Sequence, residues 1–232
     1  MNGERVKIGI EGLDTMLGGG LIPGSITAII GSYGTGKTTF ALQFLWQGVC
    51  RGEHVIYISL EEREERIKEY MAQKDWNYHQ YINKSLTVLR LDPSEFNIAI
   101  SRIKNELPDL VRKLGATRVV IDPISLFEDL FEDSALRRQE MFRLVESLRD
   151  QQCTVVMTSE TDSGNQYISR HNLIEYLCDT VILLNYVRPA DLTGVHLAVE
   201  VVKMRLSQHS REIKPYEIQK DRILVYSEAN VF

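Results

Sequence analysis

The sequence predicts an α/β fold with a mostly parallel central sheet, helices that flank the sheet, and antiparallel hairpins near the C-terminus. Two observations predict it. As far as residue 159, short apolar runs alternate with helical segments, which is the order of a parallel sheet covered by helices. After residue 178, apolar or alternating segments follow one another with no room for long helices between them. A chain of 232 residues suits one large domain over residues 1–232.

The first part of the chain alternates strands with helices. The strand segments are short and rich in β-branched side chains, as buried strands should be. The helix after the first strand is apolar, and the second helix is charged with an apolar stripe. The expected elements, in order, are strand 25–30, helix 39–46, strand 54–59, helix 62–74 and strand 86–91.

The second part continues the alternation before it turns to hairpins. We expect a helix over 95–114 that is interrupted or kinked near Pro108 and terminated by Gly115. Strand 118–122 is followed by an amphipathic helix over 135–150, whose inner face carries Met141, Phe142, Val145 and Leu148. A further strand over 153–159 and a polar loop over 161–172 follow. The chain ends with hairpin strands over 179–186, 195–203, 212–219 and 223–226, with turns at 189–194 and 220–221.

The composition limits the classes of partner and compartment. The net charge of −5 opposes nonspecific attraction to nucleic acid. The 3 cysteines are widely spaced and form no disulfide framework, which favours a reducing cytosol. The N-terminus starts no apolar signal segment, and no apolar run reaches the roughly 18 residues of a membrane span. We therefore expect a cytoplasmic protein without membrane insertion.

The most informative motif is Gly31-Ser-Tyr-Gly-Thr-Gly-Lys-Thr38, which fits the phosphate loop G-x-x-x-x-G-K-[ST]. A strand precedes it and a helix follows it, so its backbone N–H groups and the helix N-terminus would face one anion. Lys37 supplies a positive charge for the outer phosphates, and the Thr38 hydroxyl is placed to bind Mg²⁺. The residues expected to hold the phosphates are Gly34, Thr35, Gly36, Lys37, Thr38 and Thr39.

Carboxylates follow two of the expected strands. Asp122 ends a buried strand, where a phosphate-loop protein holds Mg²⁺, usually through water. A cis Asp122–Pro123 bond would aim this carboxylate at the site. Glu61 and Glu62 follow another strand and could orient and deprotonate an attacking water. An acidic pair at a helix start also serves simply to complement the helix dipole, so the residue pattern leaves both readings open.

Polar and basic groups end two further strands. The hydroxyls of Thr158 and Ser159 could sense the γ-phosphate, or merely mark a polar strand end. Lys203 and Arg205 lie two residues apart, so their side chains point the same way along a strand. They could reach the phosphates of a neighbouring subunit, although on pattern alone a solvated edge strand is favoured.

Taken together, these residues resemble the KaiC-type ATPases of the RecA/RadA superfamily, in their single-domain branch. The resemblance covers nearly the full length, and the Glu61-Glu62 pair with Lys203-Met204-Arg205 is its most specific part. It implies a RecA-like fold, ATP and Mg²⁺ as ligands, and homohexameric rings with ATP in each subunit cleft. The segments that carry the resemblance are residues 9–14, 18–24, 44–48, 58–62, 119–122, 179–184 and 202–205, with His209 four residues further on.

The resemblance also implies roles for individual residues. Glu61 and Glu62 would be the catalytic carboxylates, with Lys37 beside them. Lys203 and Arg205, with Met204 between them, would reach the γ-phosphate of ATP on the adjacent subunit. Ser207 and His209 would approach the same nucleotide, and Gln73 would touch the base.

Two departures from the family pattern matter. The small residues that usually follow the arginine are Leu206-Ser207-Gln208 here, so this contact could differ in detail. Where the kinase repeat of the clock protein has its Ser-Thr phosphoacceptor pair, this chain has Glu175 and Tyr176. We therefore expect no Ser/Thr autokinase activity at this place.

Three functions compete at this stage. The first is a ring ATPase that acts on the conformation of an unknown protein partner. The second is a recombination protein that binds DNA, which the acidic segment 128–133 and the few cations of 161–172 disfavour. The third is an assembly scaffold controlled by nucleotide, with little turnover, which the sequence separates poorly from the first.

Overall fold

The computed structural model describes residues 4–74, 76–91, 106–188 and 194–229. Within them, one sheet has the strand order β3-β2-β4-β5-β1-β6-β7-β8-β9. The strands from β3 to β6 are parallel, and β7, β8 and β9 continue the sheet as antiparallel hairpins. The predicted fold class is confirmed. The strands are β1 (Ile26–Gly31), β2 (Val55–Ser59), β3 (Leu86–Arg90), β4 (Arg118–Asp122), β5 (Thr154–Ser159), β6 (Thr180–Val187), β7 (His196–Met204), β8 (Lys214–Ile218) and β9 (Ile223–Val225).

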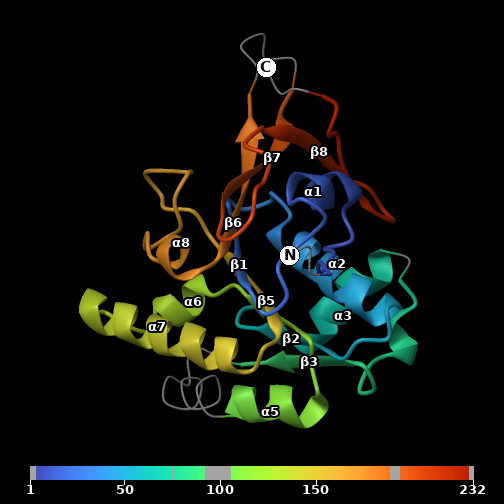
Figure 1. Ribbon diagram of the computed structural model, residues 1–232, viewed down its shortest axis with the longest axis vertical. Coiled ribbons are helices and arrows are strands. Elements are labelled where there is room, and N and C mark those ends of the chain that lie inside the picture. The colour runs from blue at the N-terminus through green and yellow to red at the C-terminus, as the bar shows by residue number, and fades with distance from the viewer. Residues whose placement is uncertain (1–3, 75, 92–105, 189–193, 230–232) are drawn as a thin grey trace.

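Helices cover both faces of the sheet (Figure 1). The ribbon shows α2 and α3 on one side and α6 and α7 on the other. The described helices are α1 (Glu11–Met16), α2 (Lys37–Cys50), α3 (Glu64–Gln73), the 3₁₀ turn η1 (Tyr78–Gln80), α5 (Leu107–Leu114), α6 (Ser125–Glu128), α7 (Ser134–Asp150) and α8 (Ile174–Leu177).

Two apolar cores lie against the two faces of the sheet. Side chains alternate between the faces of a strand, so Ala28 and Ile30 of β1 pack in one core while Ile29 packs in the other. Burial on both faces explains why the parallel strands read as nearly continuous apolar runs rather than as alternating ones. The same continuity made these strands the most recognisable elements in the sequence.

The local predictions had mixed outcomes. Pro108 lies in the first turn of α5, where a proline is well tolerated, so α5 begins close to the predicted interruption. The part of this predicted helix over 95–105 lies outside the described residues, as does most of the 189–194 turn. Phe142 is 53% exposed on α7, and Leu144 is buried in its place beside Met141. The turn at 220–221 is confirmed between β8 and β9.

Candidate functional site

The phosphate loop joins the end of β1 to the start of α2 and is shaped by two glycines in left-handed conformation. Gly34 has φ +74°, and a Cβ placed there would lie 2.4 Å from the Tyr186 hydroxyl oxygen. Gly36 has φ +87°, and its Cβ would lie 2.2 Å from Ile218 Cδ1. Only glycine fits both requirements. The loop therefore brings its backbone directly before the N-terminus of α2, which favours an anion.

Lys37 lies inside this loop and among carboxylates. Its ammonium donates to the carbonyls of Gly31 at 2.8 Å and Ser32 at 3.1 Å. Burial lowers the pKa of Lys37, and the negative charges of Asp122, Glu160 and Glu61 act in the opposite direction. The charges that interact with Lys37 thus come from the ends of β4 and β5 and from the segment after β2.

Thr35 stabilises the loop from within. It is fully buried, and its hydroxyl donates to the Ser32 carbonyl at 2.7 Å. Its own carbonyl accepts a hydrogen bond from the Tyr216 hydroxyl on β8. The Thr35 side chain is therefore engaged inside the protein, and its expected contact with phosphate rests on its backbone.

A pocket of about 360 Å³ lies beside the loop, between the start of α2 and the end of α3. It brings Gln73 next to Thr38 and Thr39, although they are far apart in the sequence. Its remaining lining includes the apolar groups of Trp76 and Ile218. The pocket has the position and the mixed lining expected of a nucleoside site, with phosphates at one end.

Asp122 is held at the end of β4 by two hydroxyl groups. The Tyr57 hydroxyl on β2 donates to Oδ2, and the Thr158 hydroxyl on β5 donates to Oδ1. Burial and the charge of Asp122 raise the pKa of Tyr57, so this phenol stays a donor. The Asp122–Pro123 peptide bond is cis, as expected.

These residues fit Mg²⁺ as phosphate-loop proteins hold it. Among the described residues, no three His, Cys, Asp or Glu side chains gather as an all-protein cage. Mg²⁺ needs no such cage, because it keeps several waters and takes one or two carboxylates together with phosphate oxygens. The Thr38 hydroxyl at the start of α2 and the Asp122 carboxylate are the oxygen ligands that this site offers.

Glu61 and Glu62 differ in their surroundings. Burial raises the pKa of Glu61, as do the negative charges of Asp122, Glu160 and Glu62, while Lys37 lowers it. The Glu62 carboxylate instead accepts a hydrogen bond from Tyr70 at 3.3 Å, and its carbonyl accepts one from Ser59 at 2.7 Å. Glu61 is therefore the residue of the pair that interacts with the loop lysine.

Lys203 and Arg205 lie at the opposite end of the sheet from their own phosphate loop. β7 runs antiparallel to β6, and Met204 pairs with Thr180 at the start of β6. Lys203 donates to the carbonyls of Glu175 and Cys178, both at 2.7 Å. Arg205 donates to the Tyr176 carbonyl at 2.8 Å. These cations hold α8 and its flanks, and the fold does not bring them to the loop of the same chain.

The residues on either side of Arg205 pack against the rest of the chain at this end of the sheet. Met204, which precedes Arg205, is buried. The Ser207 hydroxyl accepts a hydrogen bond from Arg5 at 2.8 Å. Neither ring nitrogen of His209 has a hydrogen-bond partner among the described residues. The predicted site residues from Lys203 to His209 therefore lie close to one another but far from the phosphate-loop residues Gly34 to Thr39 of the same chain.

Two contributors to the site escaped prediction. Tyr57 reads in the sequence as one more apolar strand residue, and only the pairing of β2 with β4 shows that its hydroxyl reaches Asp122. Glu160 directly follows the polar end of β5 and was assigned no role from the sequence, yet its charge affects both Lys37 and Glu61. The parallel order β2-β4-β5 brings these ends together, and no local pattern encodes that order.

The segments that could bind DNA carry paired charges. Arg170 contacts Glu160 at 2.7 Å and Asp129 at 3.2 Å, and His171 contacts Asp129 at 2.7 Å. These are the potential cations predicted for the 161–172 loop. Because acidic partners already neutralise Arg170, the loop offers little net charge to a phosphate backbone.

Glu175 and Tyr176, which the resemblance assigns to the place of the clock protein's phosphoacceptors, lie in α8. The Glu175 carboxylate accepts hydrogen bonds from the Ser169 N–H and, at 2.7 Å, from the Ser169 hydroxyl. The Tyr176 side chain is exposed. The absence of Ser/Thr autokinase activity here stays a prediction.

Comparisons with known proteins agree with this geometry. The family model described as "ATPase: KaiC" matches residues 6–230. The circadian clock oscillator protein KaiC of Prochlorococcus marinus subsp. pastoris is 31% identical over 98% of this chain, and a UPF0273 protein of Pyrococcus horikoshii is 30% identical over 96%. The crystal structure of a KaiC-like protein from Pyrococcus horikoshii matches with a TM-score of 0.83 and 29% identity, over 96% of this chain and 99% of that one.

The relatives differ in length. The match covers 46% of the Prochlorococcus clock protein but 94% of the UPF0273 protein. The chain therefore spans less than half of the clock relatives it matches, and what those whole proteins do does not transfer with the match. In the part of the chain that the structure describes, no helix has the length and apolarity to cross a membrane.

Proposed function

This chain belongs to the KaiC family of ATPases, and we propose that it hydrolyses Mg²⁺-ATP at the interfaces of a homohexameric ring. The observation that carries the proposal is the separation of Lys203 and Arg205 from their own phosphate loop. β1 has 6 residues, so its two ends lie roughly 20 Å apart at about 3.3 Å per residue. If this cation pair at the far end of the sheet contacts a phosphate loop, that loop belongs to another copy.

Within one subunit, the phosphate loop and its surroundings would bind ATP. Gly34 and Gly36 shape the loop, Lys37 binds the outer phosphates, and Thr38 with Asp122 would hold Mg²⁺ partly through water. When bound, the ion would neutralise negative charge on the phosphates. The backbone of Thr35, the side chain of Thr39 and the Gln73 amide complete the expected nucleotide contacts in the pocket beside the loop.

Glu61 would be the base that takes the proton of the attacking water. Its raised pKa and its interaction with Lys37 support this assignment. A base works best when its pKa lies close to the working pH. Glu62, tied to Tyr70 and Ser59, would orient the segment and so support Glu61 rather than replace it.

The neighbouring subunit would complete the site. Lys203 binds the Glu175 and Cys178 carbonyls, and Arg205 binds the Tyr176 carbonyl and lies 3.6 Å from the Asp179 carboxylate. Each still has further N–H donors, since an ammonium has three and a guanidinium five. Those donors can approach a γ-phosphate from the open side of the loop and stabilise charge that develops there. Met204, Ser207 and His209 would follow along the same nucleotide, although the Met204 side chain and the ring nitrogens of His209 are buried within the single subunit.

A mixing experiment tests this arrangement. Glu61→Gln removes the base, and Arg205→Ala removes a cation lent to the next subunit, so each variant alone should lose ATP turnover while still binding ATP. Mixed rings contain interfaces that join an intact Glu61 to an intact Arg205. An equal mixture should regain turnover, at about a quarter of the interfaces if assembly is random. Normal turnover by Arg205→Ala alone, or no regain on mixing, would contradict the proposal.

The remaining parts of the proposal concern the setting. Residues 1–232 would form one ATPase domain, act in the cytoplasm and serve a protein partner, with no need for nucleic acid. The free cysteines Cys50, Cys153 and Cys178 are consistent with a reducing compartment. Measuring turnover together with particle size in ATP, ADP and no nucleotide separates the ATPase from a scaffold that assembles with little turnover.

A further inference from the structure

Leu206 is an unusual residue for its place in the fold. It follows Arg205 in the turn after β7, has φ +58° and is 98% exposed. The left-handed region disfavours L-residues, and the residues that tolerate it best are Gly, Asn and Asp. An apolar side chain that is both strained and fully exposed does nothing for the isolated subunit, and such strain gathers at functional positions.

Hydrogen bonds on both sides fix the turn that presents Leu206. The Arg205 N–H donates to the Asp179 carbonyl at 2.9 Å, and the Ser210 N–H donates to the Met16 carbonyl at 2.8 Å. Between them, Arg5 donates to the Ser207 hydroxyl at 2.8 Å. The backbone flanking Leu206 is thus tied to three separate parts of the chain. The side chain projects from a rigid base.

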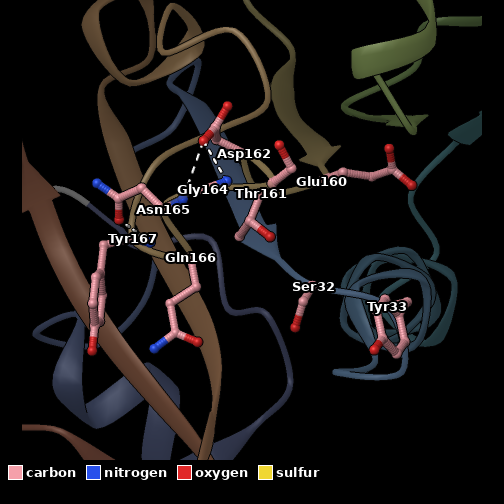
Figure 2. Close-up of a pocket in the computed structure, with 10 residues that line it drawn as sticks. Ser32, Tyr33, Glu160, Thr161, Asp162, Gly164, Asn165, Gln166 and Tyr167 are labelled. Carbon is pink, nitrogen blue, oxygen red and sulfur yellow. Dashed lines mark hydrogen bonds between the residues drawn. The ribbon is translucent and has the colours of Figure 1, made fainter.

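The opposite end of the molecule carries a matching surface. A hollow of about 650 Å³ lies between the phosphate loop and residues 160–167. Figure 2 shows Ser32 and Tyr33 on one side of it, with Tyr167 across from them. Tyr33 is 88% exposed, and of the large apolar side chains in the described ranges only Leu206 is more exposed.

Charge and direction both favour a second copy of this chain as the partner. Glu160 and Asp162 line the hollow, whereas Leu206 directly follows Arg205 in the turn, and Lys203 lies at the adjoining end of β7. The turn and the hollow lie at opposite ends of the parallel strands. A contact between them is therefore head-to-tail, and such contacts repeat from copy to copy until a ring closes.

We propose that Leu206 is an interface anchor, which seats against Tyr33 in the hollow of the next subunit. This inference rests on the proposed ring. It adds the residue that positions Lys203 and Arg205 over the neighbouring phosphate loop. An apolar anchor buried at the centre of an interface holds the polar groups around it in register and excludes water from them.

The substitution Leu206→Gly should have opposite effects on the stability of the single subunit and on ring assembly. Glycine relieves the left-handed strain, so the variant subunit should melt about 2–4 °C higher than wild type without nucleotide. The same variant should need at least about tenfold more protein to form rings with Mg²⁺-ATP, since the anchor is gone. Val202→Thr is the matched control, because Val202 in β7 is, like Leu206, an exposed apolar residue but has no left-handed strain.

Particle mass measured against protein concentration, with a thermal melt of each variant, completes the test. Tyr33→Ser should weaken assembly by a similar factor, and the double variant should be little worse than either single one. If wild type forms active rings and Leu206→Gly assembles at the same concentration, the anchor is refuted while the ring ATPase stands. If wild type neither assembles nor hydrolyses ATP, the proposed function itself fails.

Discussion

Replacing Gly36 by alanine tests whether the phosphate loop depends on a left-handed residue just before α2. Alanine in this conformation costs roughly 1 kcal/mol. Its Cβ would lie 2.2 Å from Ile218 Cδ1, and pushing this flexible end aside costs about 1 kcal/mol more. For a chain of 232 residues, about 1 kcal/mol lowers Tm by about 2–4 °C. We therefore expect Gly36→Ala to lower Tm by roughly 4–8 °C.

Gly52→Ala is the matched control for this substitution. Gly52 has φ +76°, but a Cβ there meets nothing within 4 Å, so only the strain remains. Its Tm should fall by about 2–4 °C. Differential scanning calorimetry gives both melts, and titration calorimetry gives the affinity for Mg²⁺-ATP, which should drop at least about tenfold in Gly36→Ala and not in Gly52→Ala. Equal melts, or unchanged affinity in Gly36→Ala, would refute the reasoning.

Two further predictions concern buried charges. The Arg118 side chain is 1% exposed and binds Glu53 through two hydrogen bonds of 2.7 and 2.9 Å. Glu53→Gln should therefore lower the free energy of unfolding, measured by urea denaturation, by about 1–3 kcal/mol. Glu4→Gln, which removes a surface ion pair, should not lower it. Glu128 is fully buried, and its carboxyl oxygens have no hydrogen-bond partner in the part of the chain that the structure describes. Burial, with the nearby negative charge of Glu175, raises the pKa of Glu128 to about 8. Because the pKa of Glu128 is higher in the folded than in the unfolded protein, its contribution to stability is present at low pH and is lost as pH rises toward 8. The free energy of unfolding of Glu128→Gln should therefore increase relative to that of wild type by up to about 1 kcal/mol per pH unit between about pH 5 and 8. A pH-independent difference between the two proteins in urea denaturation would contradict this.

The parallel half of the fold could be predicted because its strands are buried on both faces. Each reads as an apolar run, and the phosphate loop marks the first strand–helix junction. Short helices could not be predicted in the same way. α6 and α8 have 4 residues each, so they span about one turn and show no helical period. The prediction for Phe142 was wrong because the helical period alone does not decide which residue at the edge of an apolar stripe is buried. In α7 the buried residue is Leu144, and Phe142 is exposed.

The site could be predicted only where one segment carries all of its chemistry. The phosphate loop meets that condition, since its glycines and Lys37 are contiguous. The hydroxyls that hold Asp122 do not, because Tyr57 and Thr158 come from strands on either side of β4. Sheet order decides which strand ends meet, and that order depends on long-range packing rather than on any local pattern.

The α8 segment links the cations that we assign to the neighbouring ATP to the phosphoacceptor positions that the resemblance singled out. Lys203 binds the carbonyl of Glu175, and Arg205 binds that of Tyr176, so the backbone at these two positions sets where both cations lie. In this chain, Ser169 fixes the Glu175 carboxylate through its N–H and hydroxyl. A glutamate side chain therefore occupies the position where, as the resemblance implies, the kinase repeat carries a phosphoacceptor. The cations that we assign to the neighbouring ATP are held in one arrangement, and this suits an ATPase whose interface does not depend on its own phosphorylation.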